Sequence, residues 1–254
     1  MEMGIRELKR RIRFLVNGEE SLPGYQADGF RVTNKNIEFM NEPKFASAWR
    51  FSEAGNREAW AKRKRVPDVR WRAHTCCFAA QRAMKIDGDF VEFGVNAGLL
   101  SMTVCEYLNF GALDRKFWLF DTFAGIPEGE MTAQEAVLAK RRNAGIYFDV
   151  YDIAKRNFAK FQNAVLVKGF LPQTLDGIPI SKIAYLSIDL NVARYEKECI
   201  DRVWDKVVPG ASIVLDDYAF VGCEEQNAMW NEFAAVHGQS ILTLPTGQGL
   251  MIKQ

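Results

Sequence analysis

The chain has 254 residues, of which 48% are hydrophobic and 26% charged, and its 33 basic residues nearly balance its 32 acidic ones. This length fits one α/β domain with additions, and the near-zero net charge gives no reason to expect binding to nucleic acid or to an anionic membrane. No stretch is apolar over the length of a transmembrane helix, and the N-terminus lacks the apolar core of a signal peptide. We therefore expect a cytoplasmic protein whose five scattered cysteines stay reduced.

Residues 1–66 are expected to form a helical extension that caps the rest of the chain or contributes to a homo-oligomer. Apolar residues at helical spacing predict helices over 1–20 and 44–62, with an irregular stretch over 21–45 between them. A basic run over 62–65 is interpreted as a solvated helix end. The following proline, Pro67, marks a boundary near residue 66, and we expect residues 67–254 to form the main domain.

The main domain alternates between apolar strands and helices. Strands are predicted at 88–93, 116–121, 163–169, 182–189 and 211–217. Helices are predicted at 68–86, 150–162, 193–207 and 222–237, and a further helix runs from the turn after the first strand to about residue 110. Residues 240–253 are interpreted as two strands joined by a turn. This pattern predicts an α/β fold with a doubly wound, mostly parallel, Rossmann-like sheet, in which the C-terminal hairpin inserts one antiparallel strand.

The first strand carries Glu92 near its end and runs into a turn that contains Gly94 and Gly98. Such a turn brings backbone N–H groups to the edge of a parallel sheet, and glycines leave room for a ligand against the backbone. Asp121 ends the next strand, where an acid can accept hydrogen bonds from both hydroxyls of a ribose. Glu92 either pairs with a nearby basic side chain or anchors a cationic ligand. Because it would repel a pyrophosphate, it favours S-adenosylmethionine over a nicotinamide dinucleotide.

Acids also end the fourth and fifth strands, at Asp189, Asp216 and Asp217. Adjacent acids repel each other unless a cation or hydrogen-bond donors lie between them, and three carboxylates from neighbouring strand ends suit a hard cation such as Mg²⁺. In the alternative interpretation, Asp217 caps the following helix and only Asp216 faces the cleft. Asn191 either adds a carbonyl oxygen to this site or only shapes the turn.

Three segments, 88–95, 118–127 and 208–218, resemble the macrocin O-methyltransferase (TylF-type) family of class I S-adenosylmethionine-dependent methyltransferases. The specific signals are Phe-Asp-Thr-Phe-x-Gly-Ile-Pro in the second segment and Pro-Gly-x5-Asp-Asp-Tyr in the third. The resemblance covers residues 68–254, and it implies that 67–254 form an S-adenosylmethionine-binding methyltransferase domain. It also implies a metal-assisted methyl transfer to a hydroxyl of a small molecule, often a sugar on a natural product.

The resemblance gives roles to individual positions. It implies that the glycine turn holds the methionine part of the cofactor, that Asp121 holds the ribose, and that Asp189, Asp216 and Asp217 bind the metal. The complete set of expected cofactor-binding residues is Glu92, Gly94, Val95, Asn96, Gly98, Ser101, Asp121, Thr122, Phe123, Gly169 and Phe170.

The chain departs from the family pattern after the fourth strand. The family usually continues as Asp-x-Asp-Leu-Tyr, whereas this chain has Asn191 in place of the second acid and Ala193 in place of the tyrosine. Neither histidine lies at a strand end, so Asp189 or a metal-bound water is the expected catalytic base. Two other functions stay open: a nicotinamide-dependent oxidoreductase, and a cofactor-binding protein that has lost its chemistry. Residues 127–149 form either a lid over the acceptor or a solvated helix.

Overall fold

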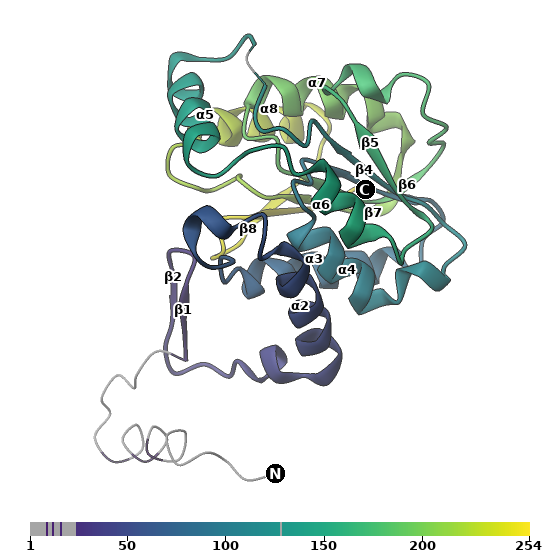
Figure 1. Cartoon of the computed structure of the whole chain (residues 1–254). Helices are drawn as coiled ribbons and strands as arrows, with labels where there is room; N and C mark the ends of the chain where they lie inside the picture. Colours follow the sequence, from purple (N-terminus) through teal and green to yellow (C-terminus); the bar gives the residue numbers. More distant parts are fainter. Residues whose placement is uncertain (1–8, 10–11, 13–15, 17–23, 128) are drawn as a thin grey trace.

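The protein is built on one central seven-stranded sheet, seen between two layers of helices in the computed structural model (Figure 1). The structure describes residues 9, 12, 16, 24–127 and 129–254, so most of the helix predicted over 1–20 lies outside the described residues. The strands of the sheet are β3 (Asp89–Phe93), β4 (Phe117–Asp121), β5 (Ala164–Lys168), β6 (Ile183–Ile188), β7 (Val207–Leu215), β8 (Ile241–Thr243) and β9 (Gly249–Ile252).

The strand order is β5-β4-β3-β6-β7-β9-β8, and β9 runs antiparallel to both of its neighbours. The chain winds outward from β3 to β5 and then returns to place β6 beside β3. The expected doubly wound sheet, with one antiparallel strand in the C-terminal hairpin, is therefore confirmed. Ligands of such sheets bind at the carboxyl ends of the strands where the winding reverses, which here means β3 and its neighbours β4 and β6.

Alternate side chains of the strands serve two separate hydrophobic cores. Phe90 packs in the core under α3 and α4, whereas Val91 and Phe93 pack in the core under α7 and α8. Because side chains alternate along a strand, Glu92 lies on the same face as Phe90 and so faces α4. The helices are α2 (Pro43–Asn56), α3 (Arg70–Ala83), α4 (Leu99–Leu108), α5 (Ala133–Gly145), α6 (Tyr151–Phe158), α7 (Ala193–Val203) and α8 (Glu224–Val236).

The N-terminal segment is not purely helical, which corrects the sequence-based expectation. A small antiparallel hairpin, β1 (Tyr25–Ala27) and β2 (Phe30–Val32), replaces part of the stretch predicted to be irregular. Its two turn residues, Asp28 and Gly29, have φ angles of 55° and 68°. An Asp-Gly pair with two positive φ angles matches the twist of a tight hairpin. The predicted helix over 44–62 also ends earlier, at Asn56, and a short 3₁₀ helix follows at Ala61–Arg63.

Several side chains that carry reactive groups have structural roles. The ring of His74 stacks on Phe39 with 4.1 Å between centroids, and the ring of His237 lies 4.3 Å from that of Phe233. Tyr218 is buried and donates a 2.8 Å hydrogen bond to Asn231. All five cysteines are buried and unpaired. None of the helices within the described residues has the length and apolar character needed to cross a membrane.

Candidate functional site

The turn between β3 and α4 depends on its glycines for packing. Gly94 and Gly98 have φ angles of 85° and 92°, which disfavour any side chain. A Cβ at Gly94 would lie 1.9 Å from the carbonyl oxygen of Asp189, and one at Gly98 would lie 2.5 Å from the ring of Phe158. The glycines therefore allow the turn to press against the β6 loop and α6. Gly94 nevertheless lines both cavities, so a ligand can lie against its backbone as expected, whereas Gly98 lines neither cavity.

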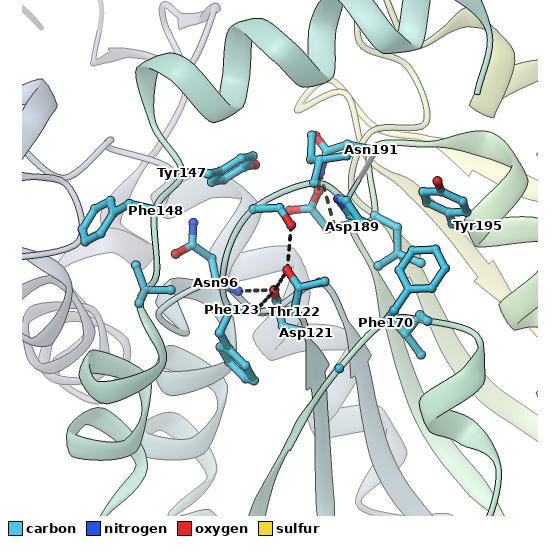
Figure 2. Close-up of a pocket in the computed structure, with 18 residues that line it drawn as sticks. Asn96, Asp121, Thr122, Phe123, Tyr147, Phe148, Phe170, Asp189, Asn191 and Tyr195 are labelled. Carbon is cyan, nitrogen blue, oxygen red and sulfur yellow. Dashed lines mark hydrogen bonds between the residues drawn. The ribbon is translucent and has the colours of Figure 1, made fainter. Parts of the chain in front are cut away.

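Asp121 joins this turn to the end of β4. Its Oδ2 accepts hydrogen bonds from the backbone N–H groups of Val95 and Asn96, both at 2.7 Å, and its Oδ1 accepts one from the N–H of Phe123 at 2.6 Å. Figure 2 shows Asp121 beside Asn96 and Phe123. Oδ1 also lies 3.3 Å from the hydroxyl oxygen of Thr122, which donates to the carbonyl oxygen of Gly125 at 2.6 Å. Most acceptor positions of Asp121 are therefore already used within the protein, and a ribose would share this carboxylate with the backbone donors.

Glu92 is a buried carboxyl group without an ion pair among the described residues. Its side chain is 4% exposed, and Oε2 has no hydrogen-bond partner. Burial raises the pKa of Glu92 to about 8, against the opposing effect of the nearby Ser101 hydroxyl. Because an unpartnered buried carboxyl is costly, its position fits a cationic group on a bound molecule better than pairing with a basic side chain.

The first of two adjoining cavities lies over the ends of β3, β4 and β5 and opens to solvent. In Figure 2, Tyr147 and Phe148 form one side, Phe170 and Tyr195 the other, and Asp121 the floor. The expected cofactor residues that line this cavity are Gly94, Asn96, Asp121, Thr122, Phe123, Gly169 and Phe170.

The second cavity lies over the ends of β3, β6 and β7 and is the roomier of the two. Glu92 and Val95 line this cavity instead of the first, while Gly98 and Ser101 are not among the lining residues of either. Gly98 is covered by α6, and Ser101 is buried beneath Glu92 in the first turn of α4. The residues common to both cavities are Gly94, Asn96, Tyr147, Asp189 and Asn191.

The three expected metal ligands meet in the second cavity. Asp189, Asp216 and Asp217 each offer a carboxylate oxygen, and these oxygens lie within 4.8 Å of one another. The following helix α8 begins only at Glu224, so the alternative in which Asp217 caps it is wrong. Asp217 Oδ2 is buried and has no hydrogen-bond partner. The donor set and this unsatisfied oxygen fit a hard divalent cation.

Two arginines flank the acid cluster and reduce its negative charge. Arg72 of α3 donates to Asp216 Oδ2 at 2.5 Å, and Arg142 of α5 lies 3.7 Å from Asp217 Oδ2. Burial disfavours a charged guanidinium, but the nearby carboxylates outweigh burial and raise the pKa of Arg72. These carboxylates belong to Asp216, Asp28 and Asp189. Burial and the other acids raise the pKa of Asp189 well above its ordinary value, and burial raises the pKa of Asp217 to about 6.

The loop after β6 is fixed by hydrogen bonds from α5 on one side and α7 on the other. Asn191 has a φ angle of 62°, and its amide Nδ2 donates to Asp189 Oδ1 at 2.9 Å. Its Oδ1 accepts a hydrogen bond from Arg142. Glu196, buried in α7, lies beside the N–H groups of this loop and accepts a 2.7 Å hydrogen bond from Trp230. Asn191 therefore shapes the turn, and its carbonyl oxygen is already engaged by a guanidinium.

Helix α5 borders the site, which favours the lid over the solvated helix for residues 127–149. It begins with a capping box between Thr132 and Glu135, and Glu135 also accepts a 2.7 Å hydrogen bond from the N–H of Ala193. Its last turn brings Arg142 to the acid cluster and is followed by Tyr147, which lines both cavities.

Sequence reasoning missed the three side chains that hold the acid cluster: Arg72, Arg142 and Gln248. Each lies far in sequence from the strand-end acids and carries no motif. The aromatic side chains among the charges of 127–149 were the one usable signal. Gln248 is fully buried and donates to Asp216 Oδ1 at 2.9 Å, but nothing in the sequence around it indicates this contact.

A model of the family described as Macrocin-O-methyltransferase (TylF) matches residues 54–241. An 8-demethyl-8-(2,3-dimethoxy-α-L-rhamnosyl)-tetracenomycin-C 4′-O-methyltransferase from Streptomyces olivaceus is 24% identical over 59% of this chain and 60% of its own length. A demethyldecarbamoylnovobiocin O-methyltransferase from Streptomyces niveus is 27% identical over 52% and 53%. The chain thus spans less than two thirds of either relative. The solved structure of the O-methyltransferase NovP is similar in fold, with a TM-score of 0.62 and 21% identity over 72% of this chain and 79% of NovP.

Proposed function

Because this chain belongs to the macrocin O-methyltransferase (TylF) family, we propose that it uses S-adenosylmethionine to methylate a hydroxyl group of a sugar or a sugar-bearing small molecule. One observation carries the proposal: two cavities meet at Gly94, Asn96 and Asp189. The first has the turn and acid of a nucleoside site, and the second contains the acid cluster. A donor in one and an acceptor in the other would meet at this junction.

The residues of the first cavity support binding of the cofactor. Asp121 lines this cavity, and its carboxylate can accept a ribose hydroxyl beside the backbone N–H groups that it already binds. The rings of Phe170 and Tyr195, which pack edge to face, offer a surface for a flat base. Glu92 lines the second cavity, next to the shared Gly94, and its unpartnered Oε2 suits a positively charged amino group that reaches across the junction from the first cavity. S-adenosylmethionine, when bound, would supply a methyl group on a positively charged sulfur.

The second cavity supports binding of the acceptor. Asp189, Asp216 and Asp217 are the proposed holders of Mg²⁺, which would lower the pKa of an acceptor hydroxyl and orient it. Asp189 is the proposed proton acceptor because it lines both cavities and so lies at the junction where donor and acceptor would meet. Asn191 carries an amide that cannot take this role, and it holds Asp189 in place instead.

The described part of the N-terminal segment supports a role as a cap. Asp28, Asn56, Trp60 and Arg63 line the second cavity together with Pro67. The segment would therefore form a wall of the acceptor site on the 67–254 methyltransferase domain. The sugar acceptor is proposed by analogy with the relative from Streptomyces olivaceus, whose name describes methylation at the 4′ position of a rhamnosyl compound.

Calorimetry tests the cofactor, and a labelled methyl group tests the reaction. We expect S-adenosylmethionine to bind at micromolar concentration and NADH not to bind. We also expect labelled methyl to reach a hydroxyl in a panel of rhamnosyl compounds, with S-adenosylhomocysteine as the second product. Asp189→Asn should lower turnover at least a hundredfold while cofactor affinity stays within about threefold. Absence of binding at millimolar S-adenosylmethionine would exclude the proposed function.

A further inference from the structure

Arg72 joins the acid cluster to the N-terminal hairpin. Its Nη1 donates to Asp216 Oδ2 at 2.5 Å, while its Nε and Nη2 donate to the two carboxylate oxygens of Asp28 at 2.7 and 3.0 Å. The guanidinium also lies 5.4 Å from the centroid of the Phe220 ring. Three of its five N–H donors are therefore used, on carboxylates that are 188 residues apart in the chain.

The Asp28 pair has the geometry of a rigid support. Both oxygens of Asp28 bind two different nitrogens of Arg72, a bidentate arrangement that fixes the plane of the guanidinium. The side chains of Asp28 and Arg72 are each 18% exposed, and that of Asp216 is 2% exposed. Asp28 occupies the hairpin turn with a φ angle of 55°, and its side chain contacts Arg72 of α3. This turn precedes residues 54–241, the part that matches the family model.

The two oxygens of Asp216 are thus held by separate parts of the fold. Gln248 of the C-terminal hairpin donates to Oδ1 at 2.9 Å, and Arg72 donates to Oδ2. Without Asp28, the guanidinium keeps the charge attraction to Asp216 but loses the two hydrogen bonds that set its orientation. A carboxylate that is free to rotate costs rate in a site where small displacements matter.

We propose that Asp28 is a positioning residue for the acid cluster: it orients Arg72, and Arg72 in turn fixes the Asp216 carboxylate that faces the acceptor cavity. The proposal rests on the proposed function of that cavity. It makes the N-terminal hairpin part of the catalytic apparatus rather than a passive cover.

The same helix and hairpin provide a matched control. Arg70 of α3 binds Asp68 at 2.7 and 2.8 Å, and the Tyr25 hydroxyl of the hairpin donates to the backbone oxygen of Asp68 at 2.7 Å. Asp68→Asn therefore weakens an ion pair in the first turn of the same helix without touching the acid cluster. Asp28→Asn keeps the size of the side chain and one acceptor oxygen but removes its charge.

The test compares these variants by steady-state kinetics and by ¹⁵N NMR of the arginine Nε–H signals. We expect Asp28→Asn to lower kcat about tenfold, with cofactor affinity unchanged and with the unfolding temperature close to that of Asp68→Asn. The Arg72 Nε–H signal should shift and exchange faster in Asp28→Asn, and Asp28→Glu should restore part of kcat. Adding Asp28→Asn to Arg72→Lys should cause no further loss.

Equal kcat in Asp28→Asn and Asp68→Asn would overturn the proposal, as would an additive double variant. Mn²⁺ binding, followed by calorimetry without cofactor or acceptor, keeps the test independent of turnover. We expect Asp28→Asn to weaken Mn²⁺ binding about tenfold and Asp68→Asn to leave it unchanged. If the wild-type protein methylates none of the rhamnosyl compounds, the proposed function fails. The NMR and Mn²⁺ results still decide the role of Asp28, because the proposal is overturned if Asp28→Asn changes neither the Arg72 signal nor the Mn²⁺ affinity.

Discussion

Replacing Glu92 by a glutamine separates stability from cofactor binding, because the two should change in opposite directions. In the folded protein, burial raises the pKa of Glu92 from 4.5 to about 8. A carboxyl group with a raised folded pKa contributes stability that is fully present below pH 4.5 and is lost as the pH rises to about 8. At about 1.36 kcal/mol per pKa unit, the loss between pH 5 and pH 8 is roughly 3 kcal/mol.

A glutamine side chain at this position carries no titratable proton, so the variant should escape this loss. Its amide can still bond to the nearby Ser101 hydroxyl. We therefore expect the unfolding free energy of Glu92→Gln, relative to wild type, to rise by roughly 3 kcal/mol from pH 5 to pH 8 in urea unfolding experiments. A difference that stays flat across this range would refute the assignment of a raised pKa to Glu92.

Cofactor affinity should fall in the same variant. Ionised Glu92 attracts the amino group of S-adenosylmethionine, so wild-type affinity should increase between pH 6 and pH 8.5, and Glu92→Gln should bind about tenfold more weakly with little pH dependence. Methylthioadenosine, which lacks the amino acid part, serves as the control ligand and should bind both proteins equally. The assignment of Glu92 to the amino group fails if both proteins bind S-adenosylmethionine with the same affinity.

Three further substitutions test the packing of the site. Gly94→Ala places a Cβ 1.9 Å from a backbone oxygen at positive φ, so we expect a loss of about 3 kcal/mol or more in thermal unfolding; an unchanged melting temperature would contradict this. Arg142→Met should lower kcat about tenfold at constant cofactor affinity, while Arg141→Met, on the same helix but exposed, should behave like wild type. Trp230→Phe removes the donor to Glu196, whose pKa burial raises to about 8. Because that hydrogen bond favours the ionised carboxylate, the unfolding free energy of the variant should fall by about 2 kcal/mol at pH 9 and by less at pH 5. Equal losses of unfolding free energy at the two pH values would refute the reasoning.

The sequence by itself determined the sheet and the residues at its edge. Apolar strands that each end in an acid can be recognised locally, because alternation and strand length leave a short-range pattern. The carboxyl ends of parallel strands meet at one edge, so Asp121, Asp189 and Asp216 could be assigned to the same edge of the sheet before any contact was known. The Asp28–Gly29 hairpin was missed although its turn signal was also local, because the surrounding residues were interpreted as irregular.

Only the tertiary structure decided what surrounds those acids. Arg72 lies 144 residues from Asp216, and Arg142 lies 75 residues from Asp217, so no sequence spacing connects them. Sequence spacing also does not explain why residue 94 must be glycine. A side chain there would collide with the carbonyl oxygen of Asp189, which lies in the loop after β6. A buried carboxylate selects its partner by distance and orientation in the folded chain, where removal from water makes each contact strong. For that reason the acids could be read from the sequence, but the arginines that hold them could not.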